Sequence, residues 1–342
     1  MAAAILTIAL LLLLVTPEAA WAWGPSTHAF LGSQILGDLA ILPPVIRELL
    51  SAYPQRFLYG NLSADITQAK EYVEYNRHCH NWAVGFEVLD EADTPELQAF
   101  ALGYLSHLAA DTIAHNVFVP RRLISTPHAK KLGHTYWEYR FDTQLGDEYL
   151  RLAREIVTSD HARPDALLEH VLTQPFFSFQ TNKRIFQHII HLSNRERWNN
   201  LWVRMADSSR WELASGTVDR YVELSLAYVH DLLMMGGASL SQQLDPIGRE
   251  PLALAKRLRR RHFRTARRET TRDFANVPIS TLTFEDAARL FAARPVAQAE
   301  IERHAEEHFP EPPWPTHSKE RFETDDADHF WSEFRTRFAA TP

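Results

Sequence analysis

Several common features are scarce in this sequence. Its 342 residues include one cysteine, Cys79, so no intramolecular disulfide can form. The formal net charge is -7, and a chain that is acidic overall gives no general indication of a nucleic-acid partner. Alternating apolar and polar residues, the pattern that predicts strands, are rare. If this protein is exported, it must be stabilised by its apolar core, by metal, or by both.

The N-terminus has the pattern of an export signal. Ala2 to Val15 is apolar apart from one threonine, which is too short for a membrane-spanning helix of about 20 residues. Small residues at Ala20 and Ala22 predict cleavage before Trp23. We therefore expect residues 1–22 to be a signal peptide and the mature protein to be secreted or periplasmic. The alternative is an uncleaved membrane anchor, since the segment before the apolar run has no Lys or Arg.

The rest of the chain has helical periodicity, with apolar residues three and four positions apart, which predicts an all-α fold. Leu97–Ala114 is apolar on most faces and should be a buried central helix, started by Thr94, Pro95 and Glu96. A second strong helix follows Gly133. Further helices are predicted at Pro164–Leu172, Asn182–Leu192, Arg195–Met205 and Val218–Leu233.

Glycine and proline predict a domain boundary near residue 240. Gly236-Gly237 and the segment from Asp245 to Gly248 interrupt the helical pattern. We expect one helical domain at residues 23–240 and a smaller helical C-terminal extension at residues 241–342. The extension contains a basic helix, an acidic amphipathic helix and a proline-rich turn at residues 310–315.

Three polar side chains interrupt the apolar central helix. His107, Asp111 and His115 are four residues apart, so an α-helix places them on one face. Burying an unpaired Asp between two histidines is costly, and a cation such as zinc would offset that cost. A buried network of hydrogen bonds between His and Asp is the alternative.

Further candidate ligands occur in other segments. His134 and Glu138 are also four residues apart, as on one face of a helix. Each of these candidates is a weak signal when taken alone. The additional candidates are His28, Asp65, His80, His134 and Glu138. The histidines beyond residue 160, of which His161 is the first, have unpatterned and surface-like contexts, and we do not expect them to bind metal.

The order of these residues resembles a known family. Trp-x4-His, Asp, His-x-Trp, His-x3-Asp-x3-His and His-x3-Glu follow one another as in the zinc-dependent phospholipase C superfamily. Residues 100–115, FALGYLSHLAADTIAH, are similar to the branch that includes the N-terminal domain of glycosylphosphatidylinositol-specific phospholipase D. The motifs cover roughly residues 23–150, and the likeness extends more loosely to about residue 235.

The resemblance implies a helical phospholipase C/nuclease-like domain that holds up to three zinc ions. One ion would be bound by the main chain of an N-terminal Trp23 and by His28, sharing Asp111 with its neighbour. The neighbouring ion would be bound by Asp65, His80, His107 and Asp111. The third ion would be bound by His115, His134 and Glu138. Asp65 is also the candidate catalytic base, because a carboxylate beside the metal ions can accept a proton from the attacking water.

Two departures from the family leave details open. Three residues separate Asp111 from His115, whereas the bacterial phospholipases C have five. The phospholipase D branch shares the short spacing but does not generally begin with Trp, so C-type or D-type cleavage is undecided. His78 competes with His80 as a ligand, and we favour His80 because His-Asn-Trp fits the family's His-x-Trp.

We therefore predict an exported zinc-dependent phosphodiesterase, a hydrolase that acts on phospholipids. A zinc-dependent 3′-nucleotidase or single-strand nuclease is the first alternative, since those enzymes also begin Trp-Gly with a His five residues after the Trp. A non-catalytic binding protein that zinc stabilises is the second.

One segment is strongly basic. Lys256–Arg268 contains eight Lys or Arg residues and no acid. Such a helix can contact an anionic membrane surface, or phosphate in a nucleic acid under the alternative function. It can also fold against the acidic remainder of the chain.

Overall fold

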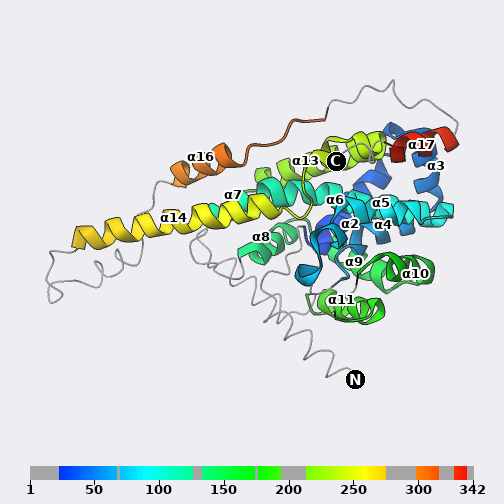
Figure 1. The fold of residues 1–342 in the computed structure, drawn as a ribbon, viewed down its shortest axis with the longest axis horizontal. Helices are drawn as coiled ribbons and strands as arrows, with labels where there is room; N and C mark the ends of the chain where they lie inside the picture. The colour runs from blue at the N-terminus through cyan, green and yellow to red at the C-terminus, as the bar shows by residue number, and fades with distance from the viewer. Residues whose placement is uncertain are drawn as a thin grey trace.

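The computed structural model describes residues 23–67, 70–125, 133–173, 176–193, 213–274, 298–315 and 327–336. Within these ranges the chain forms helices and no strands, which confirms the predicted all-α class (Figure 1). The predicted signal peptide at residues 1–22 and the predicted helix at Arg195–Met205 lie outside the described residues. No helix in the described ranges has the length and apolar character needed to cross a membrane.

The other predicted helices are present with ends shifted by a few residues. In chain order the helices are α2 (Pro25–Gly37), α3 (Pro44–Ala52), α4 (Pro54–Ser63), α5 (Trp82–Asp90), α6 (Pro95–Ile113), α7 (Val119–Ser125), α8 (Gly133–Asp142), α9 (Asp147–Thr158), α10 (Ala162–Val171), α11 (Phe179–Ser193), α13 (Ser215–Met235), α14 (Arg249–Phe274), α16 (Gln298–His308) and α17 (Ala327–Thr336). A π-helix, Ala114–Phe118, joins α6 directly to α7.

Helix α6 is the buried centre of the fold, as predicted. Thr94 is its N-cap, and its side-chain oxygen accepts a hydrogen bond from the backbone N–H of Leu97 at 3.4 Å. Pro95 occupies the first turn, where the missing N–H costs nothing. Helices α2, α4, α5 and α13 pack around α6 (Figure 1). His107 and Asp111, in its C-terminal half, are therefore buried.

Helices α4 and α6 touch through their backbones. A Cβ atom added to Gly60 would lie 2.1 Å from the carbonyl oxygen of Phe100, and one added to Gly103 would lie 2.0 Å from that of Phe57. Only two glycines facing each other permit this approach. As a result, the end of α4 lies directly against the polar face of α6.

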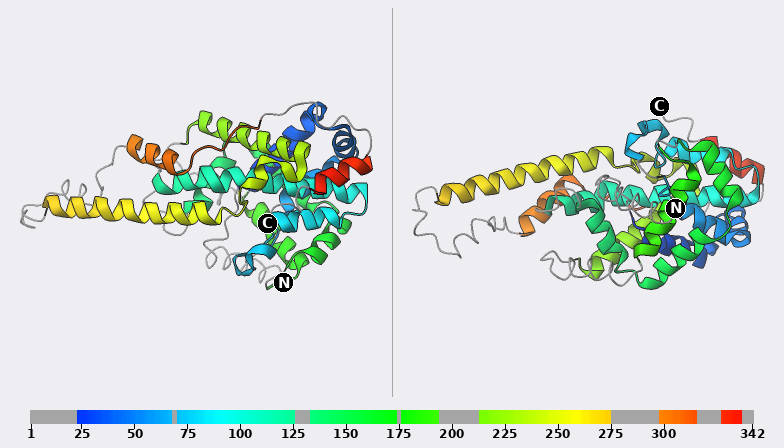
Figure 2. Two further views of the ribbon diagram at one scale, coloured as in Figure 1. Left: turned by 45° about the horizontal axis from the view of Figure 1, so that its top comes forward. Right: turned by 90° about the horizontal axis from the view of Figure 1, so that it is seen from below.

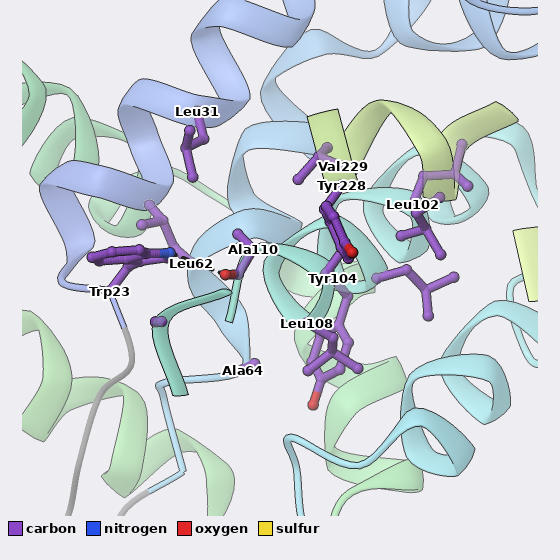
Figure 3. Close-up of a cluster of buried hydrophobic side chains, with 14 of the residues drawn as sticks. Trp23, Leu31, Leu62, Ala64, Leu102, Tyr104, Leu108, Ala110, Tyr228 and Val229 are labelled. Atoms are coloured by element: carbon purple, nitrogen blue, oxygen red, sulfur yellow. Dashed lines mark hydrogen bonds between the residues drawn. The ribbon is translucent and has the colours of Figure 1, made fainter. Parts of the chain in front are cut away.

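Trp23 anchors the start of α2 in the core. Its ring is fully buried, and its centroid lies 4.2 Å from the ring centroid of Phe141. The indole N–H donates to the carbonyl oxygen of Ala110 on α6 at 3.0 Å (Figure 3). The carboxylate of Asp142 accepts the backbone N–H groups of Ser26 and Thr27, both at 3.0 Å, and so caps α2. These contacts fix the helix that carries His28.

The chain beyond residue 240 returns to the central helices. The indole N–H of Trp82 donates to the carbonyl oxygen of Leu244 at 2.9 Å, and the side-chain amide of Asn116 donates to that of Asp245 at 2.8 Å. Helices α14 and α16 both contact α7. In both views of Figure 2, α14 (yellow) then extends beyond the helices around it. The basic segment Lys256–Arg268 lies within this helix.

A second polar network is buried beside the N-terminal half of α6, where Tyr59 packs against Phe100. Lys183 donates to Asp165 at 2.6 Å, and the hydroxyl of Tyr59 also donates to Asp165. The imidazole of His161 stacks on the ring of Tyr59 with 3.6 Å between centroids. The surface-like interpretation of His161 was therefore wrong, because this side chain is only 1% exposed. Its environment is a packed joint between α4, α10 and α11, which the isolated sequence context does not show.

Candidate metal centre

Five of the predicted ligands meet in one cluster, which we call the central cluster. Four chain segments supply them: α2, the residues after α4, the loop before α5, and α6. The central cluster consists of His28, Asp65, His80, His107 and Asp111, and all five are buried. Asn81 caps α5 by accepting the backbone N–H of Ala83 at 2.8 Å, which holds the loop that carries His80.

Asp111 lies between two sets of histidines. Its Oδ1 atom is 3.2 Å from Nε2 of His28. Its Oδ2 atom is 3.2 Å from Nε2 of His107 and 3.3 Å from Nε2 of His80. The two carboxylate oxygens therefore face different histidines, and His28, His107 and Asp111 also lie close enough together to share an ion. This arrangement is suited to a carboxylate that is shared by two ions, the role that the resemblance implies for Asp111.

Four contacts in the central cluster have lengths close to those between neighbouring ligands of a zinc ion. Besides the contacts of Asp111, Nε2 of His80 lies 3.2 Å from Oδ1 of Asp65 and 3.1 Å from Nε2 of His107. Zinc bonds of about 2.0–2.2 Å at tetrahedral angles place neighbouring ligand atoms about 3.3–3.6 Å apart. His80 and His107 each have contacts of nearly this length, so a zinc ion fits beside these two histidines and a carboxylate with small adjustments.

Main-chain carbonyl groups fix the tautomers of two histidines. Nδ1 of His107 donates to the carbonyl oxygen of Asn61 at 2.8 Å, and Nδ1 of His115 donates to that of Pro246 at 2.5 Å. Because a carbonyl oxygen can only accept, each facing Nδ1 must carry the proton. A neutral ring held in this way has its unprotonated nitrogen at Nε2, the atom that can then bind a metal ion.

His115, His134 and Glu138 form a second buried group, which we call the outer group. The ring centroids of His115 and His134 are 5.1 Å apart, and Nε2 of His134 is 2.8 Å from Oε1 of Glu138. No hydrogen bond satisfies the Nε2 atoms of these two histidines or either carboxylate oxygen of Glu138. Buried polar atoms without partners are costly, and a cation among them would remove that cost.

Burial dominates the electrostatics of the outer group. It raises the pKa of Glu138 well above its usual value, with help from the negative charges of Asp65 and Asp111. It lowers the pKa of His115 to about 4, and it lowers that of His134 well below its usual value. Without a cation these groups are held neutral. A dication would instead stabilise a charged Glu138 and two neutral imidazoles, which are the forms that bind zinc.

The carboxylates of the central cluster show the opposite shift. Burial alone would raise the pKa of Asp111, but the positive charge of His107 and the close contacts with His107, His28 and His80 outweigh the effect of burial. The pKa of Asp111 is therefore well below its usual value. Asp65 is also shifted down, because the positive charge of Lys70 and the neighbouring histidines overcome the effect of burial. Both carboxylates are ionised and ready to bind a cation.

His80, rather than His78, faces the carboxylates of the central cluster. Nδ1 of His78 accepts the backbone N–H of His80 at 3.0 Å, and the two rings are 5.5 Å apart. Cys79 is buried, with Sγ 3.2 Å from Nδ1 of His80. His78, Cys79 and His80 also lie close enough together to share an ion. That arrangement would use a different atom of His80 from the one that faces Asp65.

The structure shows contributors that the sequence did not indicate. Lys70 lies against Asp65 and His80, Asn61 and Pro246 orient two histidines, and Asp142 caps α2. No sequence motif marks any of them, because each acts through a tertiary contact. A buried Lys70 five residues after Asp65 has no local signature that separates it from a surface lysine.

The turn at residues 245–248 presses directly on His115. Gly248 has a φ angle of +62°, and a Cβ atom added to it would lie 2.4 Å from Cβ of His115 and 2.6 Å from its carbonyl oxygen. Glycine is therefore required at this position both by the backbone conformation and by the close approach.

Replacing Gly248 with alanine should selectively weaken the outer group. The added methyl group would displace His115 or its Pro246 partner, so we expect zinc bound by the outer group to be lost at least about tenfold more readily. Metal analysis after titration with a chelator measures this. The central cluster should keep its zinc, and an unchanged chelator titration would contradict the proposed contact between the turn and the outer group.

All the predicted histidine and carboxylate ligands therefore lie in one of two neighbouring groups. The binding of zinc by the main chain of Trp23 remains a prediction. The buried indole ring holds Trp23 just before α2, the helix that carries His28. Residues 27–194, about half of the chain, match the family model described as zinc dependent phospholipase C. Comparisons with curated proteins and with solved structures gave no match.

Proposed function

Residues 27–194 belong to the zinc-dependent phospholipase C family, and from this premise we propose that the chain is an exported phosphodiesterase that hydrolyses phospholipids. The observation that carries the proposal is the set of close contacts among Asp65, His80, His107 and Asp111, which we call the near-tetrahedral set, next to an outer group whose buried atoms lack hydrogen-bond partners. We propose three zinc ions: one at this set, one at Trp23, His28 and Asp111, and one at the outer group.

Zinc would supply an acidified water and positive charge that binds phosphodiester oxygens. The protein supplies the geometry and the proton transfer. Asp111, with an oxygen toward each of two histidine sets, would keep two ions at a fixed separation. Asp65 would accept the proton of the attacking water, because it supplies a carboxylate beside the metal ions. The carbonyl groups of Asn61 and Pro246 would hold the ligand rings in place.

A combined metal and substrate assay tests this proposal. The protein is produced by a secreting host, its N-terminal mass is determined, and its zinc content is measured. It is then incubated with vesicles of phosphatidylcholine, with and without anionic lipid, and separately with a 3′-nucleotide and single-stranded DNA. We expect phospholipid turnover that a chelator removes and zinc restores.

The products and the preferred substrate distinguish the possible functions. Diacylglycerol as product indicates C-type cleavage, and phosphatidic acid indicates D-type cleavage. Faster turnover on anionic vesicles supports membrane contact through Lys256–Arg268, a segment that α14 carries beyond the neighbouring helices (Figure 2). Nucleotide turnover without lipid turnover supports the nuclease alternative. Zinc binding with no hydrolysis of any substrate would reject an enzymatic function.

Blocking the amino group of Trp23 should remove one ion and most of the activity. The proposed site at Trp23 and His28 needs a free N-terminal amine, which an uncleaved leader, an N-terminal tag or acetylation would eliminate. We expect zinc content to fall by one ion per chain relative to the processed protein. Full activity and full zinc content in a chain that carries a tag before Trp23 would contradict this assignment.

A further inference from the structure

A lysine that the resemblance does not account for lies inside the proposed metal centre. Lys70 begins a short 3₁₀ helix, Lys70–Tyr72, five residues after Asp65, and it is 5% exposed. Its ammonium nitrogen is 3.0 Å from Oδ1 of Asp65 and 3.4 Å from Nε2 of His80. These are the same two atoms that form part of the near-tetrahedral set.

Lys70 lies against both of the atoms on which the central ion would depend. Zinc binds a histidine nitrogen at about 2.0–2.1 Å and a carboxylate oxygen at about 2.0–2.2 Å. An ion bound to Nε2 of His80 and Oδ1 of Asp65 would therefore lie within a few ångströms of the ammonium group. The other nitrogen of His80 faces Cys79, at 3.2 Å from Sγ, so the ring would have to flip before that nitrogen could take the place of Nε2.

The positive charge of Lys70 also disfavours a zinc ion at this position. Asp65 is the nearest carboxylate to Lys70, and a buried ion pair of this kind is strongly weakened when one partner is given a second cation. An ammonium and a zinc dication a few ångströms apart in a buried site also repel each other. Lys70 thus pairs with Asp65, and its charge opposes a metal ion bound by the same carboxylate.

We propose that Lys70 competes with the central zinc ion for Asp65 and His80, so that loading this site requires the lysine side chain to leave both atoms. This inference rests on the proposed metal centre and adds to it a residue that sets its occupancy. It predicts that the site of Asp65, His80, His107 and Asp111 binds zinc more weakly than its four-ligand geometry would otherwise permit.

Replacing Lys70 with methionine or glutamine tests the competition. Both side chains have similar length and no charge. We expect one zinc ion per chain to bind about ten- to a hundredfold more tightly than in the wild type, with the affinity of the other ions unchanged. Zinc affinity is measured on the full mature chain, stripped of metal, by competition with a zinc indicator.

Two further variants provide controls. Lys183→Met removes a lysine that is also buried and paired with a carboxylate, Asp165 at 2.6 Å, but in the remote network. It should leave zinc affinity unchanged. Lys70→Arg keeps the positive charge and should not gain affinity. A gain in Lys70→Met and Lys70→Gln that is absent from both controls supports the competition.

Thermal melting gives a second readout that a purely structural role would not reproduce. Without zinc, Lys70→Met should melt below the wild type, because Asp65 loses its cation. With zinc, the melting temperature should rise by more in the variant than in the wild type. Equal zinc affinity and an equal rise in the two proteins would overturn the competition alone. A wild-type chain that binds no zinc would overturn the proposed function as well.

Discussion

Replacing Asp111 with asparagine should cause the largest loss of metal and activity among the single ligand substitutions. Oδ1 of Asp111 is 3.2 Å from His28 and Oδ2 is 3.2 Å from His107, so the carboxylate takes part in two proposed sites. Asparagine has one carbonyl oxygen and no negative charge, and it cannot serve both. We expect zinc content to fall by up to two ions and activity to fall by at least about a hundredfold.

Asp165→Asn is the matched control for this experiment. Asp165 is also buried and receives hydrogen bonds, but from Lys183 and Tyr59 in the remote network. The control should lose stability without losing zinc. If Asp111→Asn retained its full zinc content, the assignment of a shared carboxylate would be wrong. Loss of one ion with the other sites filled would limit Asp111 to a single site.

Gly103→Ala should destabilise the protein by more than about 3 kcal/mol, a large effect for the addition of one methyl group. The new Cβ atom would lie 2.0 Å from the carbonyl oxygen of Phe57, and a backbone atom cannot rotate away as a side chain can. Helices α4 and α6 would have to separate. Urea denaturation of the zinc-loaded protein measures the loss of stability.

The consequence for the metal centre follows from the same contact. Separating α4 from α6 would lengthen the 2.8 Å hydrogen bond from His107 to the carbonyl oxygen of Asn61, so zinc binding should weaken together with stability. Gly216→Ala in α13 is the control, because a Cβ atom there meets nothing within 4 Å. It should leave stability unchanged or raise it by up to about 1 kcal/mol. Equal stability of the two variants would contradict the close helix contact.

Local signals in the sequence predicted the central helix well. The Thr94 cap, Pro95 and the apolar run up to Ile113 act within a few residues of one another, and the structure confirms the start and the burial of α6. The spacing of His107 and Asp111 also acts within one helix turn. By contrast, the grouping of Asp65 and His80 with α6 came from the resemblance to a family, since no spacing rule joins residues that are 27 positions apart, such as His80 and His107.

Contacts between distant segments could not be predicted. The close approach of Gly60 and Gly103 depends on how two helices cross. From the sequence alone, a glycine in a helical pattern indicates only a position of lower helix stability. The turn that contacts His115 lies in the segment that was predicted to begin a separate extension. Lys70 is recognisable as part of the site only from its position beside Asp65. In each case the deciding partner lies elsewhere in the chain.

The π-helix at Ala114–Phe118 contains His115, so the four-residue spacing from Asp111 to His115 ends in a turn that is wider than an α-helical one. The α-helical register predicted one shared face, but the helix widens at this point, and His115 joins His134 and Glu138 in the outer group. Such a wide turn corresponds to one additional residue in an α-helix. Deleting a residue here would restore the narrow register and rotate the following side chains by about 100°. In this segment, insertions and deletions would alter the metal complement even if every ligand were retained, because His115 lies within the wide turn and the direction of its side chain depends on the local helical register.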